Sequence, residues 1–133
     1  MRTYISAFIV LALVLAAHII GLDGYYYTID SYDIFMHIAG GAGIGLFVAA
    51  LLRSYRYGAF FSRRNIILGV IVVGIVWELF EIFYELTGHP LWTKLYYIDT
   101  IKDMIDDVLG GAIVAYIIGK KRSATSEIRE NTI

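Results

Sequence analysis

The fold is decided by residues 96–111, which read YYIDTIKDMIDDVLGG and continue into the apolar run 112–119. This pattern predicts a helix whose second half lies in a membrane and whose first half carries several carboxylates. A charged side chain at the bilayer centre costs about 3 kcal/mol on insertion scales unless it is paired or hydrated. The acids of this helix therefore need partners, either on other helices or as bound cations.

The composition is that of an integral membrane protein with one domain. Of the 133 residues, 59% are hydrophobic and 15% are aromatic, which is too apolar for a soluble domain of this size. The absence of cysteine excludes disulfides, thiolate metal ligands and thiol nucleophiles. The net charge of -1 and the lack of a basic patch interleaved with aromatics argue against a nucleic-acid partner.

Four stretches are long enough to cross about 30 Å of hydrocarbon as helices. We therefore expect an all-α, four-helix bundle in the membrane, with a transmembrane domain over 1–122 and a short cytoplasmic tail over 123–133. The first stretch is interpreted as a retained span rather than a cleaved signal peptide. The expected spans cover residues 4–22, 32–52, 65–86 and 101–119.

The basic residues predict the orientation of these spans. Lys and Arg are favoured in cytoplasmic loops, and nearly all those of this chain fall on one side if it crosses four times. We therefore expect a multi-pass protein of the cell membrane with both termini cytoplasmic. The residues behind this prediction are Arg2, Arg53, Arg56, Arg63, Arg64, Lys120, Lys121 and Arg122, against Lys94 alone on the other side.

Glycines recur inside the expected spans at packing intervals. Gly41 and Gly45 form a small-xxx-small pair, and Gly110 and Gly111 follow the acidic stretch. Such residues let helix backbones approach closely in a membrane. The same small-residue faces are compatible with a homo-oligomer.

Ionisable residues form one stripe on each of three spans, at about 100° per residue. The stripes also lie at similar depth, roughly 8–12 Å from the outer ends of their helices. We therefore expect the three stripes to meet in one polar site in the outer half of the membrane. They consist of Asp33 and His37, then Glu78, Glu81 and Glu85, then Asp99, Asp103, Asp106 and Asp107.

Lys102 and His37 cannot balance these acids. Either some carboxylates are protonated and hydrated in a water-filled vestibule, or a divalent metal ion is bound. Carboxylates with one imidazole suit Mg²⁺, Mn²⁺, Ca²⁺, Zn²⁺ or iron, and the sequence does not choose among them. We favour a metal, with the predicted ligands His37, Glu78, Glu81, Asp103 and Asp107.

The predicted catalytic residues are Asp106 or Asp99 as general base and His37 as ligand or proton donor. Simpler interpretations exist for some acids. Asp33 and Asp99 lie near expected helix starts, where the helix dipole favours a carboxylate, and Glu85 lies near a membrane exit. His18 and Trp77 are interpreted as packing residues.

The polar motifs resemble two families of small membrane proteins. Tyr32-Asp33-xxx-His37 with Gly40, Glu78-Leu79-x-Glu81 and Asp99-Thr100-xx-Asp103-Met104 resemble the YjdF-like inner-membrane proteins. The spacing Asp103-xxx-Asp107-xx-Gly110 resembles the VanZ-like families, where an Asn is usual at position 107. The resemblance covers the last three spans and implies a compact helical protein with a shared polar site. The association of VanZ-like proteins with glycopeptide tolerance implies a substrate in the cell envelope.

Three functions remain open from the sequence. The favoured one is a metal-dependent hydrolase or transferase that acts on a lipid or polyprenyl phosphate among the membrane lipids. The alternative is a cation or proton transporter or channel that uses the same acids, although the inner half of each span offers no second polar station. The third is a structural subunit whose polar site serves folding or docking.

Overall fold

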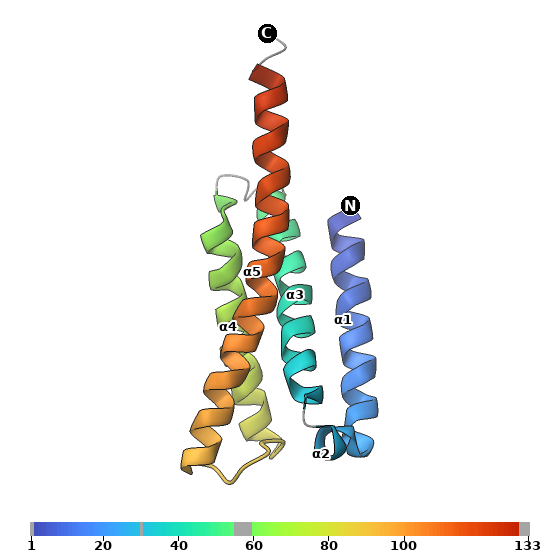
Figure 1. Ribbon diagram of the computed structural model, residues 1–133, viewed down its shortest axis with the longest axis vertical. Coiled ribbons are helices and arrows are strands. Elements are labelled where there is room, and N and C mark those ends of the chain that lie inside the picture. The colour runs from blue at the N-terminus through green and yellow to red at the C-terminus, as the bar shows by residue number, and fades with distance from the viewer. Residues whose placement is uncertain (1, 30, 55–59, 131–133) are drawn as a thin grey trace.

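The computed structural model describes residues 2–29, 31–54 and 60–130, and in this part of the chain all regular structure is helical (Figure 1). The long helices α1, α3, α4 and α5 run alternately down and up, so α1 and α4 are antiparallel to α3 and α5 (Figure 1). The elements are α1 (Arg2–Ile20), the π-helix η1 (Gly21–Tyr25), the short α2 (Tyr26–Thr28), α3 (Tyr32–Arg53), α4 (Arg63–Phe83) and α5 (Lys94–Glu130).

Among the described residues, three segments are long and apolar enough to cross a membrane: Thr3–Tyr25, Tyr32–Arg53 and Arg63–Phe83. They correspond to the first three expected spans. Helix α5 is not among them, because its first half carries the acidic stretch that decides the fold. The fourth crossing, the closed four-helix bundle and the cytoplasmic position of both termini therefore stay predictions.

The bounds of helices α4 and α5 differ from the predicted ones. Helix α4 ends at Phe83, before the expected 86, and Glu85 follows in a turn with a φ of 57°. Its side chain is exposed, as the simpler interpretation of this residue had it. Helix α5 begins at Lys94, before the expected 101, and its helical backbone continues to Glu130. Apolar content had set the predicted limits. It continues through the turn that follows α4, and it does not register the charged helical turns at the two ends of α5.

Helix α3 is the centre of the packing and contacts α1, α4 and α5, while α4 also packs on α5. The seam between α3 and α5 is made by glycine. A Cβ on Gly41 would collide with the Asp107 carbonyl oxygen, and one on Gly110 would collide with the Ile38 carbonyl oxygen. A Cβ on Gly45 would lie 3.2 Å from the Cα of Gly111. The expected close approach of helices at small residues is confirmed along this seam.

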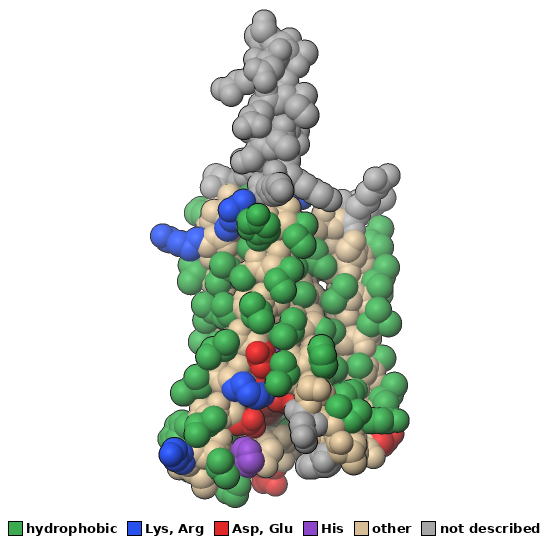
Figure 2. Space-filling model, viewed as in Figure 1, with side chains coloured by type: hydrophobic (Ala, Val, Ile, Leu, Met, Phe, Trp, Pro, Cys, Tyr) green, Lys and Arg blue, Asp and Glu red, His purple; other side chains and the backbone are tan. Residues whose placement is uncertain are grey.

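The two ends of the helix group differ in character. The buried apolar cluster lies where α3 ends, α4 begins and α5 continues, and it contains Ala49, Ile66, Val114, Ala115 and Ile118. At the opposite end, the chain reverses through η1 and α2, and the Tyr32 hydroxyl donates a hydrogen bond of 2.6 Å to the Ala17 carbonyl. On the face seen in Figure 2, hydrophobic side chains cover much of the described part, and acidic side chains gather in its lower half. That lower half is where α3 and α5 begin.

Candidate functional site

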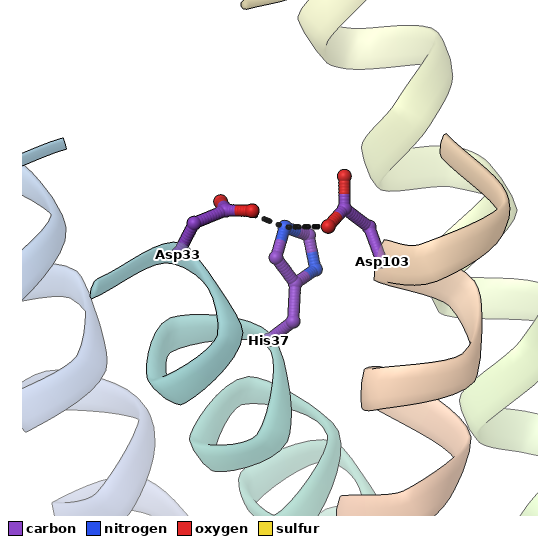
Figure 3. A group of neighbouring side chains, drawn as sticks. All are labelled: Asp33, His37 and Asp103. Carbon is purple, nitrogen blue, oxygen red and sulfur yellow. Dashed lines mark ion pairs between the residues drawn. The ribbon is translucent and has the colours of Figure 1, made fainter. Parts of the chain in front are cut away.

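His37 is the buried centre of a polar site between α3 and α5. The i,i+4 spacing on α3 brings Asp33 to the same face, with its Oδ1 3.5 Å from His37 Nε2 (Figure 3). Across the seam, Asp103 Oδ1 lies 3.8 Å from the same nitrogen. The other ring nitrogen, Nδ1, lies 3.3 Å from Asp107 Oδ1. Both nitrogens of one imidazole therefore face carboxylates from two helices.

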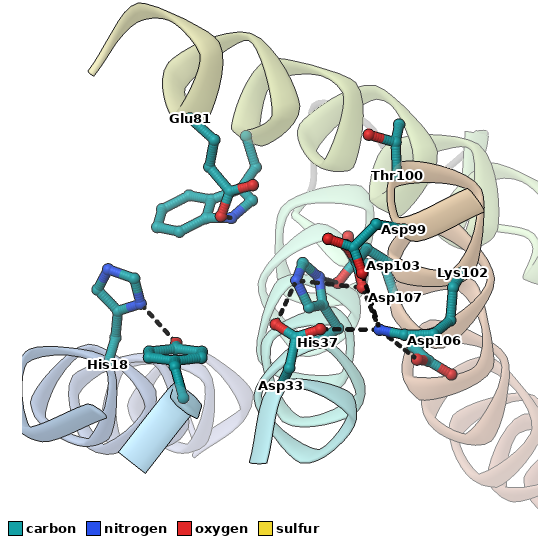
Figure 4. A network of polar contacts seen from close by, with 12 residues as sticks. His18, Asp33, His37, Glu81, Asp99, Thr100, Lys102, Asp103, Asp106 and Asp107 are labelled. Atoms are coloured by element: carbon teal, nitrogen blue, oxygen red, sulfur yellow. Dashed lines mark hydrogen bonds and ion pairs between the residues drawn. The ribbon is translucent and has the colours of Figure 1, made fainter. Parts of the chain in front are cut away.

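Lys102 is the second centre of this site. Its ammonium lies 2.6 Å from Asp103 Oδ1 and 2.8 Å from Asp33 Oδ2, so it links α5 to α3 (Figure 4). Asp99 and Asp106, on the same helix, lie further away at 3.9 and 4.0 Å. We call the following residues the polar cluster: Asp33, His37, Asp99, Lys102, Asp103, Asp106 and Asp107.

Negative charge is in excess in the polar cluster. Five aspartates surround one lysine and one histidine. The Oδ2 atom of Asp106 is buried and accepts no hydrogen bond from any described residue. Buried charge is costly unless it is paired, so the cluster can accept a further cation or bound protons.

The geometry of three residues suits a metal ion. Asp33, His37 and Asp103 each offer one ligand atom, and these atoms lie within 4.8 Å of one another. Two carboxylates with one imidazole are ligands that Mn²⁺, Zn²⁺ and Fe²⁺ share. Of these residues, Asp33 was not among the predicted ligands, because its position near a helix start had a simpler explanation. Lys102 was counted as a nearby charge but was not assigned to the site.

The predicted ligands fall into two groups. His37, Asp103 and Asp107 come together as expected, whereas Glu78 and Glu81 have separate partners on α4 and α5. Glu78 is 8% exposed and accepts a hydrogen bond of 2.9 Å from the Thr100 hydroxyl, while its Oε1 has no hydrogen-bond partner among the described residues. Glu81 accepts a hydrogen bond of 2.9 Å from Trp77 Nε1. The two predicted bases, Asp99 and Asp106, lie at the margin of the cluster beside Lys102.

A cavity of about 200 Å³ adjoins the polar cluster between α1, α3 and α4. His37 and Asp107 line it, so the cavity and the cluster share these two residues. Glu81 and His18 line the same space and point toward it from α4 and α1 (Figure 4). His18 and Trp77 thus border a cavity, a role that periodicity alone could not distinguish from ordinary packing.

The α1 side of this cavity is held by aromatic contacts. The Tyr26 hydroxyl lies 2.7 Å from His18 Nδ1, and the His18 and Trp77 rings meet edge to face at 5.4 Å. Burial raises the pKa of Tyr26, so its hydroxyl keeps its proton and can donate to His18. The Tyr26 and Trp77 side chains therefore fix the position of His18 at the polar end of the cavity.

These features define an all-helical, multi-pass membrane protein with a buried polar cluster of carboxylates, imidazole and ammonium. The chain belongs to the family described as Predicted membrane protein (DUF2238), which residues 1–123 match. No curated protein and no solved structure matches the chain. Membership confirms the membrane class expected from the composition, and the finer resemblance to YjdF-like and VanZ-like proteins stays a prediction.

Proposed function

We propose that the polar cluster binds a divalent metal ion through Asp33, His37 and Asp103. The observation that carries this proposal is the arrangement of their three ligand atoms within 4.8 Å of one another. The position of Asp107 supports it, since metal-bound histidines nearly always donate their other N–H to a carboxylate or carbonyl. His37 Nδ1 faces Asp107 and its Nε2 faces the other two ligands. Asp107 is then a positioning residue rather than a direct ligand.

In this proposal, the Lys102 ammonium competes with the metal ion for the same carboxylates. Its ammonium binds the same Asp33 and Asp103 carboxylates that would hold the metal. The side chain is 38% exposed, and lysine has a long flexible stem, so the ammonium can turn away when a metal ion enters. A displaced ammonium would remain close to the metal, where it can pair with an anionic substrate.

We further propose a metal-dependent enzyme that hydrolyses or transfers a lipid phosphate. The metal would polarise a phosphoryl oxygen and lower the pKa of a bound water. In hydrolysis, the water oxygen bonds to phosphorus, its proton passes to a carboxylate, and the P–O bond to the leaving group breaks as that oxygen takes a proton. Asp106 is the preferred base over Asp99, because its Oδ2 is buried and has no hydrogen-bond partner among the described residues, whereas the Asp99 side chain is 34% exposed.

Elemental analysis of the purified protein tests the metal site. The wild-type protein should retain Mn²⁺ or Zn²⁺ near one equivalent, and His37→Ala and Asp103→Asn should each lose it. Asp23→Asn is the matched control, because Asp23 is exposed in η1 and outside the polar cluster. Phosphate release from farnesyl phosphate should follow the metal content. Equal metal content in wild type and both variants would contradict the proposal.

Transport of a cation or proton is the second candidate, and one observation favours it. His18, His37, Glu81 and Asp107 line one cavity, so titratable groups extend from the cluster toward α1. The opposite end of the molecule is packed with Ile66, Val114 and other apolar residues. Metal-dependent flux into proteoliposomes that is lost in Glu81→Gln would favour transport over hydrolysis.

A further inference from the structure

The cavity beside the polar cluster has two chemically different ends. Leu11 and Val14 of α1, Ile44 of α3 and Val70 of α4 form its apolar part. His18, Trp77 and Glu81, together with His37 and Asp107 of the polar cluster, form its other end. A mostly apolar pocket with a few polar groups at one end is the usual form of a site for an amphiphile.

The apolar part of the cavity reaches the outer surface between α1 and α4. Leu15 and Val73 both line the cavity, yet they are 58% and 37% exposed. Helix α1 packs mainly along α3. It meets α4 near the polar end of the cavity, where the His18 ring of α1 contacts the Trp77 ring of α4. In a membrane, the surface at Leu15 and Val73 faces hydrocarbon, so a lipid chain can enter there without crossing water.

We propose that this cavity holds the hydrocarbon chain of a single-chain lipid phosphate, with the phosphate at the polar cluster. The assignment of the chain rests on the cavity, and the assignment of the phosphate rests on the proposed metal site. Without a metal, the surplus of carboxylates would repel a phosphate. With a metal bound to Asp33, His37 and Asp103, the same place attracts it.

The size of the cavity suits a chain rather than water. An apolar cavity of roughly 150 Å³ stays dry and binds benzene, whereas a water needs two to four polar partners. The cavity here is about 200 Å³, and its apolar part offers no such partners. Gly40 keeps part of this space open, because a Cβ at that position would meet only Val14, at 4.0 Å.

Trp77 offers a direct test, because it is one of two tryptophans and lines the cavity. The other, Trp92, is 71% exposed in the connection between α4 and α5, so Trp92→Phe leaves Trp77 as the sole reporter. Two probes are compared in detergent: an alkyl phosphate and the corresponding alcohol, each with bromine on the chain to quench nearby tryptophan fluorescence. Each titration is made with and without Mn²⁺.

We expect saturable quenching of Trp77 by the brominated alkyl phosphate, tightened by Mn²⁺. Gly40→Leu should weaken it by about tenfold or more, because the leucine side chain fills the space of the lipid chain. Val73→Phe should also weaken it, and Val72→Phe is the matched control, since Val72 is 61% exposed and does not line the cavity. A variant that loses helical content or monodispersity is replaced by the other cavity variant.

The two probes separate the parts of the proposal. Saturable quenching by the alcohol and the phosphate alike, with no effect of Mn²⁺, would support the chain site and contradict the metal-bound phosphate. Quenching that rises linearly with probe and is equal in wild type and Gly40→Leu would mean that bulk lipid alone contacts Trp77. That result would overturn the chain site even if elemental analysis finds a metal.

Discussion

Gly41 of α3 lies directly against the backbone of Asp107 in α5, so closely that a Cβ at position 41 would collide with the Asp107 carbonyl oxygen. Gly110 meets the Ile38 carbonyl oxygen in the reciprocal way. These contacts set the distance between α3 and α5. They thereby place the short aspartate side chains of α5 within reach of His37.

We predict that Gly41→Ala destabilises the protein and disrupts the polar cluster. A methyl group at this position meets backbone atoms, which cannot turn aside, so α3 and α5 must separate. The expected cost is about 1–3 kcal/mol, as for other overpacked sites. Chemical unfolding in micelles gives the stability, and Mn²⁺ titration should show a weaker site.

Gly40→Ala is the control for this prediction, because its added Cβ would have only Val14 nearby. Alanine favours helix over glycine by about 1 kcal/mol, so Gly40→Ala should be neutral or stabilising. Equal stability changes in the two variants would show that close approach at Gly41 does not limit the packing.

Replacing Lys102 with methionine should strengthen metal binding. The ammonium contacts Asp33 and Asp103, and its removal frees both carboxylates for a divalent cation. We expect Mn²⁺ affinity to rise about tenfold, while the metal-free variant becomes less stable because its carboxylates lose their partner. Saturating Mn²⁺ at about 100 times its Kd should restore about 2.7 kcal/mol.

Lys94→Met is the matched control, since Lys94 lies on the same helix but is exposed and outside the cluster. Weaker Mn²⁺ binding in Lys102→Met than in wild type would show that the ammonium supports the cation rather than competing with it.

Asp107 and Asp103 should differ in their effect on metal binding. Asp107 faces His37 Nδ1 and orients the ring, so Asp107→Asn should lower affinity by about 10- to 100-fold. Asp103 is a proposed direct ligand of the metal, so Asp103→Asn should remove binding altogether. Calorimetric titration with Mn²⁺ distinguishes the two, and the opposite order would exchange their assigned roles.

Because Thr100 donates a hydrogen bond to Glu78, substitutions at these two residues should have strongly coupled effects on the free energy of unfolding. The Thr100 hydroxyl is the donor to a buried carboxylate whose other oxygen has no partner among the described residues. Thr100→Val should therefore cost about 1–3 kcal/mol, because the carboxylate becomes fully unsatisfied. Adding Glu78→Leu to Thr100→Val should recover most of that loss, since both polar partners are then absent.

A double-mutant cycle of unfolding free energies measures this coupling. Thr28→Val is the control, because its hydroxyl donates to the Gly24 carbonyl at an exposed position and should matter less. Additive effects of Thr100→Val and Glu78→Leu would contradict the predicted coupling.

Much of the polar cluster could be predicted from the sequence. Helical periodicity placed Asp103 and Asp107 on one face of the last expected span and His37 on one face of the second. The glycines indicated that these two faces approach closely. Periodicity describes one helix at a time, however, and does not give the relative rotation of two helices. It therefore could not separate Glu78 and Glu81, which bind Thr100 and Trp77, from the acids around His37.

Lys102 and Asp33 belong to the polar cluster, but sequence reasoning did not assign them to the predicted metal site. A lysine among acids is an ordinary solvated pattern, and an acid near a helix start has a ready explanation. Only the packing of α3 on α5 shows that the Lys102 ammonium crosses the seam to Asp33 at 2.8 Å. The cavity was also beyond sequence reasoning, because its lining residues come from α1, α2, α3, α4 and α5.

The ion pairs around His37 and Lys102 all lie within α3 and α5 or join one to the other. Helix α1 contributes Leu11, Val14, Leu15 and His18 to the cavity wall and none of the residues of the polar cluster. Evolution can therefore reshape the wall through α1 without disturbing the charges, and the two halves of the site can diversify at different rates.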